Sequence, residues 1–327
     1  MKIGYLGPKG TFTETALNKY LERNRISASV YAAHSIFELF KGLNSHEYNE
    51  IIIPIENSVE GNVNASLDLM VQTSGMYFKE EIILLIKQAL LAKEQFDLSE
   101  ITDIVSHPQP FAQCQEFIKT YLPQANTHHV TSTALAAEMV AHDRFCVDEH
   151  AYSMGNSSSK VDAGIKMGEE KNPVNQKSSC ISAESGSFHG SCPVTVAVIG
   201  NEALADIYNL KLLKKDIQDY LNNSTRFIVV ANKQTKPTGK DKTSFVFSTR
   251  QDKPGGLYSI LGEFAERQIN LTRITSRPTK NGLGEYLFFL DCEGHAEEPA
   301  IASALNAVQK KASYFKLLGS YKKDEEA

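Results

Sequence analysis

The chain has 327 residues, of which 42% are hydrophobic and 22% are charged, and its formal net charge is −5. This composition is typical of a folded protein of about two domains and excludes a disordered or fibrous chain. A mildly acidic chain is not built primarily to bind nucleic acid or an anionic membrane surface. The sequence has no apolar run near the roughly 18 residues of a membrane span, and no apolar signal-peptide region near its start. Five scattered cysteines indicate reduced thiols and a cytoplasmic location.

The first part of the chain alternates predicted strands and helices. Short apolar runs predict strands at residues 2–6, 29–33 and 50–55. Thr11 with Glu14 and Ser35 with Glu38 have the spacing of capping boxes and predict the starts of two helices, and a third helix is predicted at residues 64–72. This alternation predicts a parallel sheet with helices on its faces.

A second α/β region follows. Strands are predicted at residues 82–91, 101–106, 127–130, 195–200 and 225–231, with helices at 110–121, 131–140 and 202–208. Residues 143–192 are rich in Ser and Gly and show neither the strand period of 2 nor the helix period of 3.6. They are therefore predicted to be a polar surface insertion. Its Cys and His spacings are loosely zinc-like, but structural zinc sites show cleaner ligand pairs, so incidental loop residues are favoured: Cys146, His150, Cys180, His189 and Cys192.

The C-terminal part is predicted to be a separate domain. Lysine-rich residues 233–243 read as a solvated linker that ends the first domain, residues 1–232. Residues 244–321 have the order strand, helix, strand, strand, helix, strand, which is the ferredoxin-like arrangement. The predicted helices cover 256–267 and 299–311, the strands 244–249, 271–275, 285–292 and 314–318, and residues 322–327 are predicted to be a charged tail.

Two loops after predicted strands in the first region carry polar groups. Residues 7–11 (GPKGT) match no nucleotide-binding glycine pattern, and an anion site and a plain tight turn are about equally favoured. Residues 54–58 (PIENS) place a carboxylate, an amide and a hydroxyl at the carboxyl end of a parallel strand, where ligands bind in such sheets. The alternative is that Asn57 or Ser58 only caps the next helix.

Two further segments invite a chemical interpretation. Residues 106–110 (SHPQP) repeat this geometry, and His107 is either a general base or a structural histidine. In residues 223–227, an Arg beside a hydroxyl suits carboxylate binding and proton donation, whereas a surface Arg and a strand-favouring Thr would be the ordinary explanation.

Taken together and in this order, these motifs resemble the prephenate dehydratase family. The resemblance rests on residues 7–12 (GPKGTF), 54–58 (PIENS), 106–114 (SHPQPFAQC), 131–137 (TSTALAA) and 225–227 (TRF). The C-terminal domain resembles the family's ACT domain through residues 255–258 (GGLY) and 275–278 (TSRP). Thr275 stands where the family usually has Glu, and the family usually has only a few residues in place of the insertion.

The resemblance implies conversion of prephenate to phenylpyruvate with loss of CO2 and water, without a redox cofactor, PLP or a metal. It implies an α/β fold of two lobes, similar to type II periplasmic binding proteins with the active site in the cleft between them, followed by the ACT domain. Strands before about residue 75 and after about residue 200 would form one lobe. The chemistry needs a hydrogen-bond donor at the departing hydroxyl.

By this resemblance the implied catalytic residues are Thr225, which would act within a network with Glu56, Asn57 or Ser106, and Gln113. The implied substrate-binding residues are Gly10, Thr11, Ser58, Thr133, Arg226 and Phe227, with backbone N–H groups near Gly10–Thr11 and Ser58–Glu60 holding carboxylates. Phenylalanine is the implied inhibitor, bound in a homodimer or homotetramer near Gly255, Gly256, Leu257, Asn270, Leu271, Ser276 and Arg277.

Three alternative functions stay open at this point. The two-lobed shape also suits a non-catalytic solute receptor, which the TRF motif opposes. The same elimination on arogenate is not distinguished by the sequence. A regulatory module on a degenerate enzyme is opposed by the intact motifs.

Overall fold

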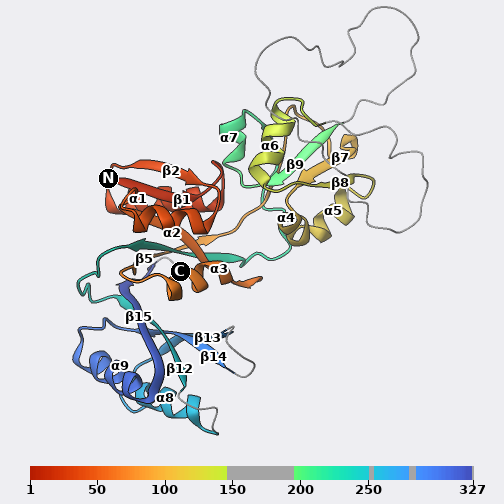
Figure 1. Cartoon of the computed structure of the whole chain (residues 1–327). Helices are drawn as coiled ribbons and strands as arrows, with labels where there is room; N and C mark the ends of the chain where they lie inside the picture. Colours follow the sequence, from red (N-terminus) through yellow and green to blue (C-terminus); the bar gives the residue numbers. More distant parts are fainter. Residues whose placement is uncertain (146–194, 250–253, 280–284, 326–327) are drawn as a thin grey trace, which may run out of the picture. The chain divides into compact units, whose positions relative to one another are not determined.

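The computed structural model describes residues 1–145, 195–249, 254–279 and 285–325 (Figure 1). The predicted insertion therefore lies almost entirely outside the described residues, as do its Cys and His residues. The chain divides into two compact units. The first consists of residues 1–88 and 220–327, and the second consists of residues 89–219.

The N-terminal part of the first unit is an α/β layer structure. Its elements are β1 (Lys2–Leu6), α1 (Phe12–Asn24), β2 (Ser29–Ala33), α2 (Ile36–Asn44), β3 (Glu50–Asn57), β4 (Gly61–Asn62), α3 (Asn64–Gln72), β5 (Tyr77–Leu85) and the returning strand β11 (Ser224–Ala231). The sheet order is β5-β11-β3-β1-β2. Strands β1, β2 and β3 are parallel, and β11 pairs antiparallel with both β3 and β5.

The local sequence explains where these elements begin. Thr11 Oγ accepts from the N–H of Glu14 and Ser35 Oγ accepts from the N–H of Glu38, so both capping hydroxyls work as predicted. Ile51, Ile52 and Ile53 are fully buried, which is why β3 reads as a continuous apolar run covered on both faces. The strand β3 continues to Asn57, so the polar residues expected in a loop form its last positions.

The second unit is another α/β layer structure. Its elements are β6 (Ala89–Ala92), the 3-10 turn η1 (Leu98–Glu100), β7 (Asp103–Ser106), α4 (Pro108–Gln113), α5 (Gln115–Tyr121), β8 (Asn126–His129), α6 (Thr133–Ala141), β9 (Val196–Gly200), α7 (Leu204–Tyr208) and β10 (Lys211–Lys214). The sheet order is β10-β6-β9-β7-β8, in which β7, β8 and β9 are parallel.

The C-terminal domain has the predicted ferredoxin-like order. Its elements are β12 (Asp241–Thr249), α8 (Gly256–Ala265), β13 (Leu271–Pro278), β14 (Tyr286–Glu293), α9 (Pro299–Lys311) and β15 (Ala312–Lys322). They form the sheet order β13-β14-β12-β15. A single parallel pairing of Lys322 with Glu80 joins β15 to β5, so this sheet continues that of the N-terminal part.

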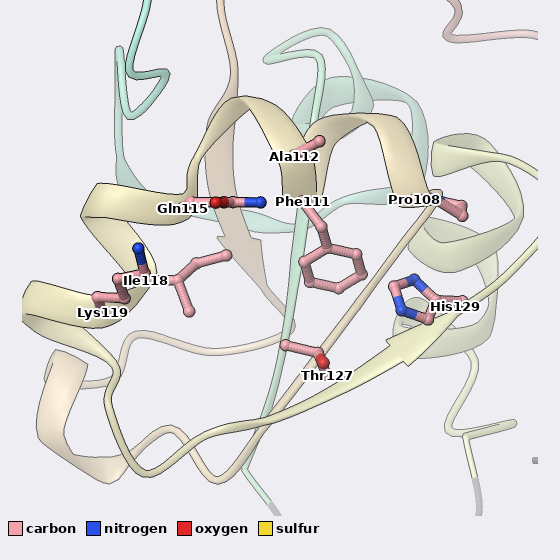
Figure 2. Close-up of a pocket in the computed structure, with 8 residues that line it drawn as sticks. All are labelled: Pro108, Phe111, Ala112, Gln115, Ile118, Lys119, Thr127 and His129. Atoms are coloured by element: carbon pink, nitrogen blue, oxygen red, sulfur yellow. The ribbon is translucent and has the colours of Figure 1, made fainter. Parts of the chain in front are cut away.

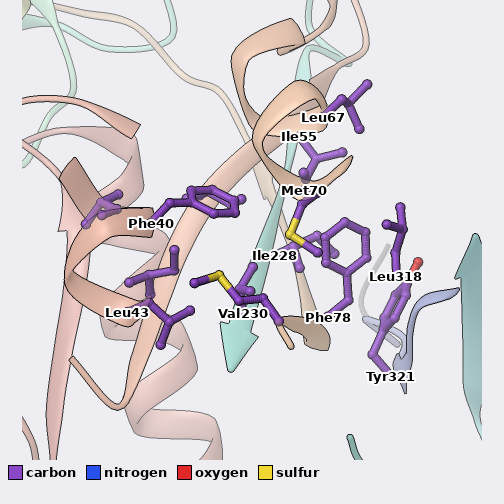
Figure 3. Close-up of a cluster of buried hydrophobic side chains, with 14 of the residues drawn as sticks. Phe40, Leu43, Ile55, Leu67, Met70, Phe78, Ile228, Val230, Leu318 and Tyr321 are labelled. Atoms are coloured by element: carbon purple, nitrogen blue, oxygen red, sulfur yellow. The ribbon is translucent and has the colours of Figure 1, made fainter. Parts of the chain in front are cut away.

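Apolar side chains from both parts of the first unit form one core. Figure 3 shows Leu318 and Tyr321 of β15 in the same cluster as Phe78 of β5 and Met70 of α3. The cluster extends to Ile55 of β3 and to strand β11. Because these side chains are fully or almost fully buried, the C-terminal domain shares hydrophobic stabilisation with the strands of the N-terminal part.

Three predictions about boundaries are wrong. Residues 82–91 form two strands, because the chain passes from one unit to the other at Gln88 and a continuous apolar run hides that break. The unit boundaries lie at 88/89 and 219/220, so β5 belongs to the first unit, and β10, which follows residue 200, belongs to the second. The predicted linker ends early, since β12 already begins at Asp241.

The predicted charged tail is also wrong at Asp324. Its side chain is fully buried, and its carboxylate binds Lys19 and Arg23 of α1 at 3.3 and 2.7 Å. It also accepts from the backbone N–H of Ile83 at 2.7 Å. The last residues therefore hold α1 against β5, an arrangement that charge patterning near a chain end does not reveal.

Replacing Asp324 by Ala should lower the free energy of unfolding by about 2 kcal/mol. The substitution removes the carboxylate that pairs with Lys19 and Arg23. The destabilisation is smaller than for a fully buried ion pair, because both cations keep some contact with water. Urea unfolding measures the difference. Glu325→Ala, which removes the neighbouring exposed carboxylate, is the matched control and should leave the midpoint nearly unchanged. Equal midpoints for both variants would contradict the assignment.

Candidate active site

Thr225 and Asn57 face each other where β11 begins and β3 ends. The strand register pairs the two residues directly, and the Asn57 Nδ2 donates to Thr225 Oγ1 at 2.9 Å. Asn57 is buried, whereas Thr225 is half-buried. The carboxyl ends of the parallel strands β1 and β3 lie at this edge, which is the usual ligand edge of such sheets.

The orientation of the Asn57 amide is fixed by two backbone donors. Its Oδ1 accepts from the N–H groups of Val59 and Glu60, both at 2.9 Å. Its Nδ2 therefore points the other way and donates to Thr225. Because the Thr225 oxygen accepts this hydrogen bond, its own O–H proton is free to be donated to another group.

The backbone N–H groups expected to bind carboxylates are already used. The N–H of Ser58 donates to the Ser224 carbonyl at 2.9 Å, and those of Val59 and Glu60 bind Asn57. The N–H of Gly10 donates to the Glu14 carboxylate at 2.6 Å, so this side chain occupies the start of α1. In this structure these four groups thus have partners within the chain, and a role for this region in holding the substrate stays a prediction.

Glu56 and Arg226 project from the opposite face to Thr225, since neighbouring strand residues alternate. Glu56 Oε2 lies 3.1 Å from Nε of Arg273 on β13 and 3.7 Å from Nη1 of Arg226. Of the proposed partners of Thr225 in the first unit, Asn57 is therefore in place and Glu56 is not. Phe227 lies on the Thr225 face but is buried in the core with Ile3 and Tyr5.

The Arg226 guanidinium is a buried ionic centre. It contacts Asp291 of β14 at 2.6 Å, Glu81 of β5 at 2.6 Å and the Tyr321 hydroxyl of β15 at 2.5 Å. Burial by itself would raise the pKa of the Asp291 carboxyl, but Arg226 and Arg273 outweigh this effect and hold that pKa below its usual range. These contacts join β11 to the C-terminal domain, and a contact between Arg226 and a substrate carboxylate stays a prediction.

Three predicted site residues belong to the second unit. Ser106 ends β7 and its buried hydroxyl donates to the Ile199 carbonyl at 2.6 Å. Thr133 begins α6 and lies beside Gly200, which ends β9, while Gln113 is buried at the end of α4. Because β7, β8 and β9 are parallel, Ser106 and Thr133 share the carboxyl edge of this sheet.

Comparison with known families decides the wider assignment. Residues 3–235 match the family model of prephenate dehydratase, and residues 244–309 match that of the ACT domain. The chain belongs to the prephenate dehydratase family. It is 34% identical over 319 residues to a prephenate dehydratase of Methanocaldococcus jannaschii, covering 97% of this chain and 96% of the relative.

Solved structures agree with this assignment. A prephenate dehydratase from Arthrobacter aurescens, solved in complex with L-Phe, has a TM-score of 0.76 and 29% identity, and covers 98% of this chain and 90% of its own. The enzyme from Staphylococcus aureus has a TM-score of 0.72 and 26% identity, covering 98% and 100%. The expected fold class is confirmed, and the chain is a hydro-lyase that converts prephenate to phenylpyruvate.

The predicted phenylalanine-binding residues of the ACT domain differ in their surroundings. Gly255 has a left-handed φ of 83° and precedes α8, which begins at Gly256. Leu257 and Leu271 pack against the domain core. Ser276 and Asn270 are exposed, whereas Arg277 binds Asp68 of α3 at 2.9 Å and is therefore not a free ligand-binding cation in this structure.

A pocket of about 330 Å³ on the second unit does not coincide with the predicted site of the dehydratase. Figure 2 shows Phe111, Ile118 and His129 among its lining residues, from α4, α5 and β8. It contains none of the implied catalytic or substrate-binding residues. In the described part of the chain, no group of three or more His, Cys, Asp or Glu residues is arranged for a metal, and no helix is long and apolar enough to cross a membrane.

The sequence analysis missed two residues that shape this region. Asn223 is 1% exposed, and its Oδ1 accepts from Asn57 Nδ2 at 2.7 Å. Asp291 is 1% exposed and pairs with Arg226. The position of Asn223, a polar residue two places before the TRF motif, could have indicated that it belongs to the site. No local pattern points to Asp291, because its partner lies 65 residues away.

Asp291→Asn should destabilise the dehydratase by about 3 kcal/mol at pH 7, because Arg226 would lose its buried counter-charge. Since the pKa of Asp291 in the folded state lies below the unfolded value of about 3.9, its stabilisation is complete above that value and is lost as the pH falls through the folded pKa. The stability difference between wild type and variant should therefore narrow below about pH 4.

Chemical denaturation from pH 7 to pH 3 measures this dependence. Glu285→Gln removes an exposed carboxylate of the same domain and should change stability little at any pH. A difference between wild type and Asp291→Asn that stays constant over the range would show that the ion pair is not its source.

Proposed function

We propose that Thr225 is the hydrogen-bond and proton donor of the reaction and that Asn57 orients it. In the elimination, the ring carboxylate leaves as CO2, its bond electrons enter the ring, and the C4 hydroxyl leaves as water after taking up a proton. The observation that carries the proposal is the hydrogen bond from Asn57 Nδ2 to Thr225 Oγ1, which leaves the threonine O–H proton for the substrate.

The amide also makes the threonine a better donor. As the proton moves toward the leaving oxygen, negative charge develops on Thr225 Oγ1, and a fixed N–H group that points at this oxygen stabilises that charge. The half-buried position of Thr225 strengthens such an interaction relative to water. A hydroxyl alone is a weak acid, so this support is what the mechanism requires.

Substrate binding is expected to be weak at the departing carboxylate. An ion pair there would stabilise the group that has to leave, and only interactions stronger in the transition state raise kcat. The commitment of Arg226 to Asp291 and Glu81 agrees with this requirement. The contributions of Ser106, Gln113 and Thr133 in the second unit stay predictions.

Thr225→Ala should lower kcat on prephenate by about 100-fold or more with little change in KM, because it removes the donor without touching the fold. Steady-state turnover of prephenate and of arogenate measures the effect and the substrate preference together. Thr225→Ser keeps the hydroxyl and is the matched control, so it should retain most activity. Near wild-type turnover by Thr225→Ala would remove this residue from the mechanism.

Phenylalanine is proposed as the feedback inhibitor, bound at the start of α8 and the adjoining strand β13. The Arthrobacter aurescens relative was solved with L-Phe, and Gly255 and Gly256 allow close approach of a carboxylate to the backbone of α8. An inhibitor must bind the less active state more tightly, and typical couplings are 1–3 kcal/mol.

The strand β13 provides a direct physical connection for this inhibition. Three alternate residues on one face contact the end of the catalytic strand β3 and the segment that follows it: Arg273 binds Glu56 at 3.1 Å, Thr275 accepts from Asn62 at 2.8 Å, and Arg277 binds Asp68 at 2.9 Å. Thr275, in place of the usual family Glu, thus makes a neutral hydrogen bond. A ligand that shifts β13 would act on this segment.

A homodimer or homotetramer in the cytoplasm is also proposed. In the part of the chain that the structure describes, β13 is an edge strand, and Ile274 on it and Tyr286 opposite its end are exposed, which suits pairing with a second copy. Burial raises the pKa of the Cys114 and Cys292 thiols to about 12, so both stay protonated and unreactive at neutral pH.

Gly256→Asp should abolish inhibition by phenylalanine and leave the uninhibited kcat nearly intact. The new carboxylate would repel the ligand carboxylate, while an acidic residue in the first turn is favourable for α8 itself. Activity is measured against phenylalanine concentration. Gly262→Asp adds the same charge farther along the helix and should retain inhibition. If wild type neither binds phenylalanine nor slows in its presence, the regulatory assignment is wrong.

A further inference from the structure

Asn223 lies between the catalytic pair and the strand that leaves the first unit. Its backbone carbonyl accepts from the N–H of Ile86 at 2.7 Å, which fixes the residue beside the end of β5. Its side chain is buried, and its Oδ1 accepts from Asn57 Nδ2 at 2.7 Å. The Asn57 amide thus donates both of its protons, one to Asn223 and one to Thr225.

The orientation of the Asn223 amide leaves its Nδ2 buried without a hydrogen-bond partner among the described residues. Turning the amide over would place its NH2 group against that of Asn57, so the acceptor must face Asn57. A buried donor without a partner is unfavourable, and a residue kept only for packing would not need it. The acceptor oxygen is therefore the feature that explains an asparagine here.

We propose that Asn223 is a positioning residue, whose Oδ1 holds the Asn57 amide so that Asn57 Nδ2 donates to Thr225 Oγ1. This inference rests on the proposed role of Thr225. The Asn57 amide is then held at three points, by the Val59 and Glu60 N–H groups on its oxygen and by Asn223 on its nitrogen. Without Asn223, one proton of this NH2 group loses its partner, and the amide is then held at its oxygen alone, so its nitrogen is aimed less firmly at Thr225.

Asn223→Ala should lower kcat roughly tenfold with little change in KM, the scale of one hydrogen bond lost behind the donor. Asn223→Leu has a similar volume but no acceptor, so it should lose as much activity as Asn223→Ala. It also controls for any loss of stability that the smaller alanine causes. Asn223→Asp offers an acceptor oxygen in either protonation state and should restore most of kcat. Asn222→Ala, at the exposed neighbouring asparagine, is the matched control and should be unchanged.

A double-mutant cycle separates positioning from a general structural effect. If Asn223 acts through Asn57, Asn57→Ala and Asn57→Ala/Asn223→Ala should have the same kcat, since the amide being held is already gone. The inference would be overturned if the double variant lost kcat by the product of the two single losses, or if Asn223→Leu kept the wild-type kcat. Should Thr225→Ala also retain activity, the proposed function fails; a loss confined to Thr225→Ala leaves that function standing and rejects Asn223 alone.

Discussion

The antiparallel pairing of β11 with β3 is the constraint on which the rest of the first unit depends. The register sets Thr225 opposite Asn57 and Arg226 opposite Glu56. Since side chains alternate along a strand, the first pair and the second pair face opposite sides of the sheet. One side carries the hydroxyl and its amide support, and the other carries a buried ion network that reaches the ACT domain.

This division explains why two adjacent residues of one motif do different work. Thr225 needs a fixed neutral donor and access for a substrate, whereas Arg226 needs the carboxylates of Glu81 and Asp291 to offset its burial. A one-residue slip in the pairing would exchange the two sides. The pairing of β11 with β3 shifts by one residue between Arg226 and Phe227, directly after the Arg226–Glu56 pair. Such a bulge pins the register of the two strands at this point.

Sequence patterns predicted the elements whose signals are local. The helices at 64–72 and 299–311 have the predicted bounds, because apolar periodicity defines both and Pro299 marks the start of the second. The proximity of Asn57 to Thr225 followed from family motifs and strand ends. The partners of Arg226, the burial of Asp324 and the break within 82–91 depend on contacts between distant segments, which no local pattern contains.

The central place of β11 in its sheet bears on the order in which the chain folds. This strand lies between β3 and β5, yet it is synthesised more than 130 residues after them. The second unit, residues 89–219, is continuous in sequence and has all its strands before β11 emerges from the ribosome. The N-terminal strands must therefore wait, with an unfilled gap in their sheet, until the middle of the chain has been made. Even then α1 lacks the Asp324 carboxylate, so its contacts are completed only after the ACT domain has been synthesised.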